Sequence, residues 1–299
     1  MTKFVFKLKE AFQKGTISFR LIYVNAAVFL ITALVAVFFQ LFNKNVAGVF
    51  SFLELPASFT QLGERPWALV TYMFMHANFL HLLFNMLWLY WFGMLFLYFF
   101  SAKHLRGLYL LGGMFGGLLY MLCYNVFPYF RPMVEYSTMV GASASVLAIV
   151  MAVAYREPDY RVRLLLIGSI RLKYIAFVVV LSDLLFITSS NAGGHIAHLG
   201  GVLAGLCFAV GLNKGIDVTG WINKLLDIAS LPFRKTTWRR KRKPSMKVHY
   251  NHKVKDYEYN ANKKKRSDEV DNILDKLKKS GYESLNAEEK QTLFDASKR

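Results

Sequence analysis

The stretch Leu21–Phe42, LIYVNAAVFLITALVAVFFQLF, decides the class of fold to which this chain belongs. It contains no Lys, Arg, Asp or Glu over a length that crosses the ~30 Å hydrocarbon core of a bilayer as one helix. The preceding residues are polar and basic, and the run is too long for the apolar part of a cleavable signal peptide. We therefore interpret it as a retained first membrane span.

The composition of the whole chain agrees with this interpretation. Of its 299 residues 55% are hydrophobic, and the mean hydropathy is +0.30, which is more apolar than a soluble domain usually is. Several further runs have the length of a membrane-crossing helix. The sequence therefore predicts an all-α polytopic membrane protein with six spans, near residues 21–42, 79–100, 106–127, 142–155, 173–189 and 197–213.

Basic residues in the loops predict the orientation of the spans. They gather at the N-terminus and after spans two and four: Lys3, Lys7, Lys9, Lys14, Arg20, Lys103, Arg106, Arg156, Arg161, Arg163, Arg171 and Lys173. The alternate loops carry few. Because cytoplasmic loops are enriched in Lys and Arg, both termini are expected in the cytoplasm. The layout favours a multi-pass protein of a bacterial inner membrane.

The composition also divides the chain into four parts. Residues 1–20 are expected to form a cytoplasmic segment, 21–213 the six-span domain, 214–266 a basic linker and 267–299 a small helical hairpin. Within the membrane domain, residues 43–78 predict a partly helical interfacial loop. The net charge of +18 includes two basic runs in the linker, Arg239–Lys243 and Lys263–Arg266. Such runs beside a membrane favour contact with anionic lipid, and nucleic acid is not expected as a partner.

The hairpin is predicted from helical spacing and from capping residues. Apolar residues recur after Ser267 at a helical interval, namely Val270, Ile273, Leu274 and Leu277. Gly281 is expected to end this helix, and Asn286 is a candidate cap for a second one that ends near Phe294.

The segment Gly141-Ala142-Ser143-Ala144 places a serine where the short fourth span begins. Alone, such a serine is most often a packing residue. Span six begins with Ala197-His198, at the same outer end of the predicted bundle. Polar groups inside a bilayer are costly and usually functional, so this pair indicates a nucleophile and its base. Small neighbours such as Gly141 leave the hydroxyl accessible, and a helix start offers free N–H groups to an oxyanion.

Span two adds a second polar group. His81 and Asn85 are four residues apart and share one helix face, where their N–H groups suit an oxyanion. His76 precedes the helix and is expected to tie down the loop. Two alternatives stay open: zinc bound by His76, His81 and His198, which lacks the usual carboxylate or thiolate, and haem held by His81 and His198. We expect no metal and no cofactor.

The remaining polar and sulfur-containing residues inside the spans are given lesser roles. His195 is expected in the outer loop, so His198 is the preferred base. Asp183 is the only acid well inside a span, and a third catalytic role for it is disfavoured, which leaves a Ser-His dyad. Cys123 and Cys207 fall inside hydrophobic runs and predict neither a disulfide nor a metal site.

Three motifs in this order resemble the rhomboid family of intramembrane serine proteases: His76–Asn85 (HANFLHLLFN), Gly141–Ala144 (GASA) and Ala197–Gly201 (AHLGG), followed by Gly205. The resemblance covers about residues 15–213. It implies a six-helix rhomboid-like bundle, single-span membrane proteins as substrates, and cleavage near the outer membrane face.

The resemblance also implies roles for individual residues. Ser143 would be the nucleophile and His198 the base, with an oxyanion hole formed by His81, Asn85 and the backbone N–H of Ser143. Two positions depart from the family pattern. Trp67 is followed by Ala68 where the family often has arginine, and Leu147 stands where an aromatic residue often stacks on the catalytic histidine.

Two other functions stay open beside the protease. A rhomboid-like pseudoenzyme would bind membrane proteins without cleaving them, although the reacting residues are all present. A transporter usually shows internal repeats and polar groups near the midplane, which this sequence does not have. The sequence alone identifies neither the substrate nor the oligomeric state.

Overall fold

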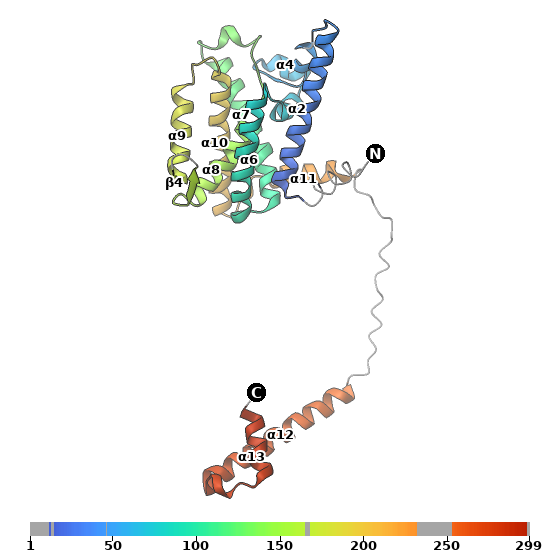
Figure 1. Cartoon of the computed structure of the whole chain (residues 1–299), viewed down its shortest axis with the longest axis vertical. Coiled ribbons are helices and arrows are strands. Elements are labelled where there is room, and N and C mark those ends of the chain that lie inside the picture. The colour runs from blue at the N-terminus through green and yellow to red at the C-terminus, as the bar shows by residue number, and fades with distance from the viewer. Residues whose placement is uncertain (1–11, 13–14, 46, 165–167, 232–252, 298–299) are drawn as a thin grey trace. The chain divides into compact units, whose positions relative to one another are not determined.

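The computed structural model of the chain describes residues 12, 15–45, 47–164, 168–231 and 253–297. It divides into two compact units, Met1–Arg234 and Lys235–Arg299. In the first unit six helices run side by side (Figure 1): α2 Ile17–Leu41, α6 Phe79–Phe99, α7 Ala102–Val126, α8 Ser143–Arg156, α9 Leu172–Leu185 and α10 Ala192–Asn213. The prediction of an all-α polytopic bundle is confirmed.

The helix lengths separate the six into two groups. By length and composition α2, α6, α7 and α10 are suited to cross a membrane, whereas α8 and α9 have 14 residues each. The predicted start of the last span at residue 197 was too late. The helix α10 begins at Ala192. Its first turn contains Gly193 and Gly194, which do not extend the apolar run from which the span was predicted. His195 therefore lies in the first turn of α10, and our placement of it in a loop was wrong.

Small residues join α7 to the other central helices. A Cβ atom at Gly112 would collide with the Cβ of Ala148, and one at Gly116 would lie 2.5 Å from the Cβ of Ala144. Glycines at this spacing let two helix backbones approach closely, which is a common way to associate helices in lipid. As a result α7, α8 and α10 form the interior of the unit.

The first helix, α2, is peripheral and is held by polar side chains. Ser18 and Asn25 are its buried residues. The Nδ2 of Asn25 donates to the hydroxyl of Tyr109 at 3.0 Å, and this hydroxyl donates to the carbonyl oxygen of Met73 at 3.2 Å. In a bilayer the apolar helix surfaces can face lipid equally well, so they do not drive association. Hydrogen bonds such as these therefore help to fix which helices pair.

The segment between α2 and α6 is partly helical, as predicted. It contains α3 Ala47–Ser51, β1 Leu55–Pro56, α4 Phe59–Glu64, α5 Ala68–Thr71 and a 3-10 turn at Tyr72–Phe74. Arg65 donates to the carbonyl oxygen of Ser51, and the indole N–H of Trp67 donates to that of Phe52 at 2.9 Å. Both residues thus anchor this segment to its own backbone.

Short strands complete the first unit. The strand β1 pairs antiparallel with β2 Thr138–Met139, which follows a 3-10 turn at Arg131–Met133 and leads into α8. Between α8 and α9 the strands β3 Arg161–Leu164 and β4 Gly168–Arg171 form an antiparallel hairpin that we did not predict. Just before it, the exposed carboxylate of Asp159 pairs with the Nζ of Lys173 at 2.7 Å.

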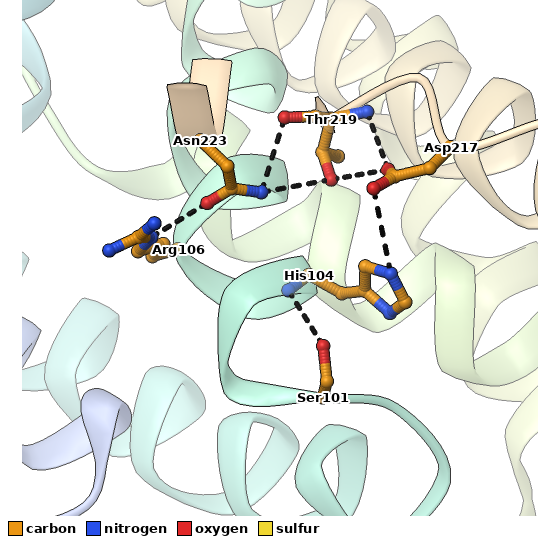
Figure 2. Close-up of polar contacts among 6 residues, drawn as sticks. All are labelled: Ser101, His104, Arg106, Asp217, Thr219 and Asn223. Atoms are coloured by element: carbon orange, nitrogen blue, oxygen red, sulfur yellow. Dashed lines mark hydrogen bonds and ion pairs between the residues drawn. The ribbon is translucent and has the colours of Figure 1, made fainter. Parts of the chain in front are cut away.

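The chain after α10 is not simply a linker, because it folds back onto α7. The helix α11, Gly220–Ala229, buries Ile222 and Asn223. Figure 2 shows the Nε of Arg106, on α7, donating to the Oδ1 of Asn223 at 2.6 Å. Arg106 also pairs with Asp227 at 2.8 Å. The helix carries only two charged residues, Lys224 and Asp227, and is amphipathic, so the prediction of a linker from residue 214 was wrong here.

A second set of contacts in Figure 2 fixes the turn before α11. The carboxylate of Asp217 accepts hydrogen bonds from the backbone N–H and the hydroxyl of Thr219, at 2.8 and 2.6 Å. His104 lies 3.7 Å from the same carboxylate, and its backbone N–H donates to the capping hydroxyl of Ser101. The start of α7 and the turn before α11 are therefore tied together.

The second unit is a helical hairpin, as predicted, with an earlier start. It consists of α12 Lys253–Ser280, a 3-10 turn at Tyr282–Ser284 and α13 Ala287–Ser297. We expected the first helix at Ser267. Residues 253–266 are polar and strongly charged, so they show no apolar periodicity although Lys and Arg favour helix. Arg239–Lys243 and most of the N-terminal segment 1–20 lie outside the described residues.

The second helix of the hairpin begins with a capping box. The side chain of Asn286 accepts from the backbone N–H of Glu289, and the carboxylate of Glu289 accepts from the N–H of Asn286, both at 2.8 Å. The candidate cap is thus confirmed. The hydrogen bond from the backbone N–H of Asn286, and then the hydrogen bond from Lys276, lower the pKa of Glu289.

Asn286→Ala is expected to destabilise α13 by about 1 kcal/mol, because one helix N–H loses its acceptor. Hydrogen exchange of the α13 amides in the full-length protein measures this as faster exchange. Asn272→Ala, on the exposed side of α12, is the control and should leave the α13 amides unchanged. Equal exchange in both variants would contradict a stabilising cap.

Candidate functional site

Ser143 is the first residue of α8, and the backbone before it is sharply turned. Gly141 has a φ of +134°, a conformation open to glycine, and its N–H donates to the carbonyl oxygen of Tyr72 at 2.9 Å. A Cβ atom at Gly141 would lie 2.9 Å from the Nε2 of His81 and 3.7 Å from the Oγ of Ser143. Because Gly141 has no side chain, the imidazole of His81 can approach the backbone beside Ser143.

His198 reaches the same region because α10 lies directly against α8. A Cβ atom at Gly201 would collide with the carbonyl oxygen of Ala144, and one at Gly205 would collide with that of Ala148. Gly201 follows His198 by three residues, and Ala144 follows Ser143. The glycine contact thus brings the end of α10 that carries His198 close to the end of α8 that carries Ser143.

Gly201→Val is expected to destabilise the membrane unit by about 3 kcal/mol, because the added side chain meets a backbone carbonyl that cannot rotate away. Thermal unfolding of the detergent-purified protein measures this as a lower Tm. Gly63→Val is a suitable control, since a Cβ atom there meets nothing within 4 Å. A variant at Gly201 that unfolds like wild type would contradict the close approach.

His81 and Asn85 enter the site from α6. The backbone N–H of His81 is capped by the Oδ1 of Asn78 at 2.9 Å, which fixes the first turn of the helix. One N–H of the Asn85 amide donates to the carbonyl oxygen of His81 at 2.8 Å. A primary amide has two N–H groups, so this bond leaves the other one for a ligand.

His76 contacts His81 but does not line the cavity. Its ring is buried and packs edge-on against that of His81, with the ring centroids 5.2 Å apart. Burial, and then the nearby His81, lower the pKa of His76 to about 4. A neutral ring is therefore favoured at neutral pH, and the contact fits a supporting position.

Four of the predicted residues meet at one cavity of about 690 Å³. Ser143 from α8, His198 from α10, and His81 with Asn85 from α6 all line it. Leu147, where the resemblance implied an aromatic residue, lines it too. His195 and His76 do not belong to the lining. Of the two histidines at the start of α10, the cavity therefore includes the one that we preferred as the base.

Asp183 changes our interpretation of the base. It lies on α9, its side chain is buried, and its Oδ1 is 2.9 Å from the Nδ1 of His198 and 2.8 Å from the Nδ1 of His195. We expected that no acid would orient His198, and this expectation was wrong. The signal in the sequence was the rarity of a carboxylate inside a span.

The same three side chains form the one set of potential metal ligands that is found among the described residues. Atoms of Asp183, His195 and His198 lie within 4.8 Å of one another. The zinc alternative from the sequence used His76, His81 and His198, which is a different set. The distances of 2.8 and 2.9 Å are those of hydrogen bonds.

Fold and cavity together define a polytopic membrane protein with a polar, partly buried site where three helices begin. A family model for the Rhomboid domain matches residues 63–214, and the chain belongs to the rhomboid family, which comprises intramembrane proteases and related pseudoenzymes. A second family model, for a family of unknown function (DUF6576), matches residues 253–299, the hairpin of α12 and α13. No curated protein matches the chain.

Proposed function

We propose that this protein is an intramembrane serine endopeptidase in which Ser143 is the nucleophile and His198 the general base. The observation that carries the proposal is that both side chains line one cavity, although they come from different helices, α8 and α10. Nucleophilic catalysis by serine needs such a base within reach of the hydroxyl.

The surroundings of Ser143 supply donors for the oxyanion that forms during acyl transfer. The helix α8 starts at Ser143 without a side-chain cap, so its first N–H groups are available and carry partial positive charge. His81 and Asn85 line the same cavity and carry further N–H groups. Donors arranged in advance around a developing negative charge make a large contribution to catalysis.

The reaction follows from these positions. The imidazole of His198 accepts the proton of the Ser143 hydroxyl while Oγ attacks the scissile carbonyl carbon. The tetrahedral oxyanion is held by the N–H donors. The imidazolium then gives its proton to the leaving amine as the C–N bond breaks, which leaves an ester on Ser143. Water, deprotonated by His198, hydrolyses this ester and restores the serine.

Substrate and orientation follow from the family resemblance and from the charge pattern. We assign single-span membrane proteins as substrates, cut near the outer face of a bacterial inner membrane, with both termini of this chain in the cytoplasm. The basic residues after the last span are placed against anionic lipid, a position in which each Lys or Arg contributes about 1 kcal/mol.

The test is reaction of the detergent-purified protein with a fluorophosphonate probe, followed by peptide mapping of the adduct. We expect one adduct, on Ser143, and cleavage of a single-span protein reconstituted with the enzyme in liposomes. A folded protein that forms no adduct would contradict the proposal and favour a pseudoenzyme that binds membrane proteins without cutting them.

A further inference from the structure

We propose that Asp183 is a positioning residue that holds the Nδ1–H of His198 and so presents the Nε2 lone pair of this ring to Ser143. This inference rests on the function proposed above and extends the catalytic pair to a Ser-His-Asp relay. It starts from one contact: the Oδ1 of Asp183, on α9, lies 2.9 Å from the Nδ1 of His198, on α10.

Burial makes this contact energetically important. The side chain of Asp183 is only 4% exposed, and its Oδ2 has no hydrogen-bond partner among the residues that the structure describes. A buried carboxylate without partners is strongly destabilising. In the described part of the chain, the polar partners of this carboxylate are the Nδ1 atoms of His195 and His198.

The contact decides which nitrogen of His198 carries the proton. An ionised carboxylate only accepts hydrogen bonds, so the Nδ1 that faces it must be the protonated nitrogen of the ring. In a neutral imidazole the opposite nitrogen, Nε2, then holds a lone pair. Because His198 lines the cavity with Ser143, this lone pair is available to the serine hydroxyl.

The carboxylate also stabilises the charged state that the reaction creates. When His198 takes the proton of Ser143 it becomes an imidazolium, and a carboxylate at hydrogen-bond distance offsets this charge. His195 lies three residues before His198 on the same face of α10 and shares the same oxygen, at 2.8 Å. Since His195 is not part of the cavity lining, it acts as a second support for Asp183.

A bound metal ion is the competing explanation for three such side chains. Ligands around tetrahedral zinc sit ~2.0–2.2 Å from the ion and therefore lie more than ~3 Å apart. The two Asp183–histidine distances are shorter than this and match hydrogen bonds. A metal ion bound at Nδ1 would also use the lone pair of this nitrogen, whereas the relay needs Nδ1 to carry a proton and donate a hydrogen bond.

The test measures the limiting rate of fluorophosphonate labelling, kinact, separately from the probe constant KI. We expect Asp183→Asn to lower kinact about 10²–10⁴-fold with KI unchanged, because the amide can hold the ring in the wrong tautomer. Asp183→Glu, which keeps the carboxylate, should restore part of this loss. Asp159→Asn, at an exposed carboxylate just before the β3–β4 hairpin, is the matched control and should label like wild type.

If Asp183→Asn folds, three results would overturn the inference. One is an Asp183→Asn variant that labels within threefold of wild type, and another is a loss confined to KI. The third is a stoichiometric metal ion in the purified wild type that disappears in Asp183→Asn. Should Asp183→Asn fail to fold, nitrogen NMR of ¹⁵N-histidine-labelled wild type decides: protonated Nδ1 on His198 supports the relay, and protonated Nε2 overturns it.

The failure of this inference can be told apart from failure of the proposed function. If wild type forms no adduct on Ser143, the protease proposal fails whatever Asp183 does. If wild type forms the adduct and Asp183→Asn forms it equally fast, the protease proposal stands and the role of Asp183 falls.

Discussion

Ser143→Ala is expected to abolish both fluorophosphonate labelling and substrate cleavage, with a loss of at least about 10⁴-fold. The substitution removes the oxygen that forms the covalent ester, and no other atom of the site replaces it. The helix α8 should stay intact, since alanine favours helix and the packing of α8 uses its other faces. The measurement is the labelling rate together with the thermal unfolding of the same sample.

Ser145→Ala is the matched control on the same helix. Ser145 is fully buried, its Oγ has no hydrogen-bond partner among the described residues, and it is not part of the cavity lining. We expect this variant to label and cleave at the wild-type rate. Labelling that survives in Ser143→Ala, or is lost in Ser145→Ala, would place the nucleophile elsewhere.

His198→Ala is expected to lower labelling and cleavage by at least about 10³-fold, because Ser143 loses its proton acceptor. His195→Ala should cost less than about tenfold, since His195 lies outside the cavity, where its Nδ1 bonds Asp183 and its ring packs edge-on against that of His198. Both substitutions remove one imidazole from the same end of α10, so the pair separates proton transfer from packing.

Labelling and cleavage are measured on the two variants at equal concentration. Thermal unfolding of each sample shows whether the variant is folded. If His195→Ala were the inactive variant and His198→Ala the active one, the assignment of the base would be reversed. If both were fully active, the histidines would serve only the structure and the dyad would be contradicted.

The spans were predictable from the sequence because an apolar run of sufficient length has few alternatives in a folded protein. Leu21–Phe42 is found as α2, with its start moved to Ile17. The helix α11 was missed because it has only ten residues and lies in a basic stretch that was assigned as a whole to a linker. The start of α12 was missed for a related reason, since its first turns have helix propensity without an apolar pattern.

The candidate site was predictable where its residues fall in short motifs. His81 and Asn85 share a helix face, and Ser143 and His198 were both expected at the outer end of the predicted bundle. The contact of Asp183 with His198 spans 15 residues and two helices, and it depends on the rotation of α9 against α10. The spacing of residues along one helix does not show how two helices are rotated against each other.

The polar cavity beside Ser143 also concerns the second reactant of a hydrolase. Each peptide bond consumes one water molecule, and hydrocarbon provides almost none. Ser182 and Asn191 line the cavity together with Asn78, and side chains of this kind hold water by hydrogen bonds. In the protease proposed above, such a cavity would supply the water that hydrolyses the ester on Ser143, whereas formation of the ester needs none. A drier cavity would therefore trap the enzyme as its covalent intermediate.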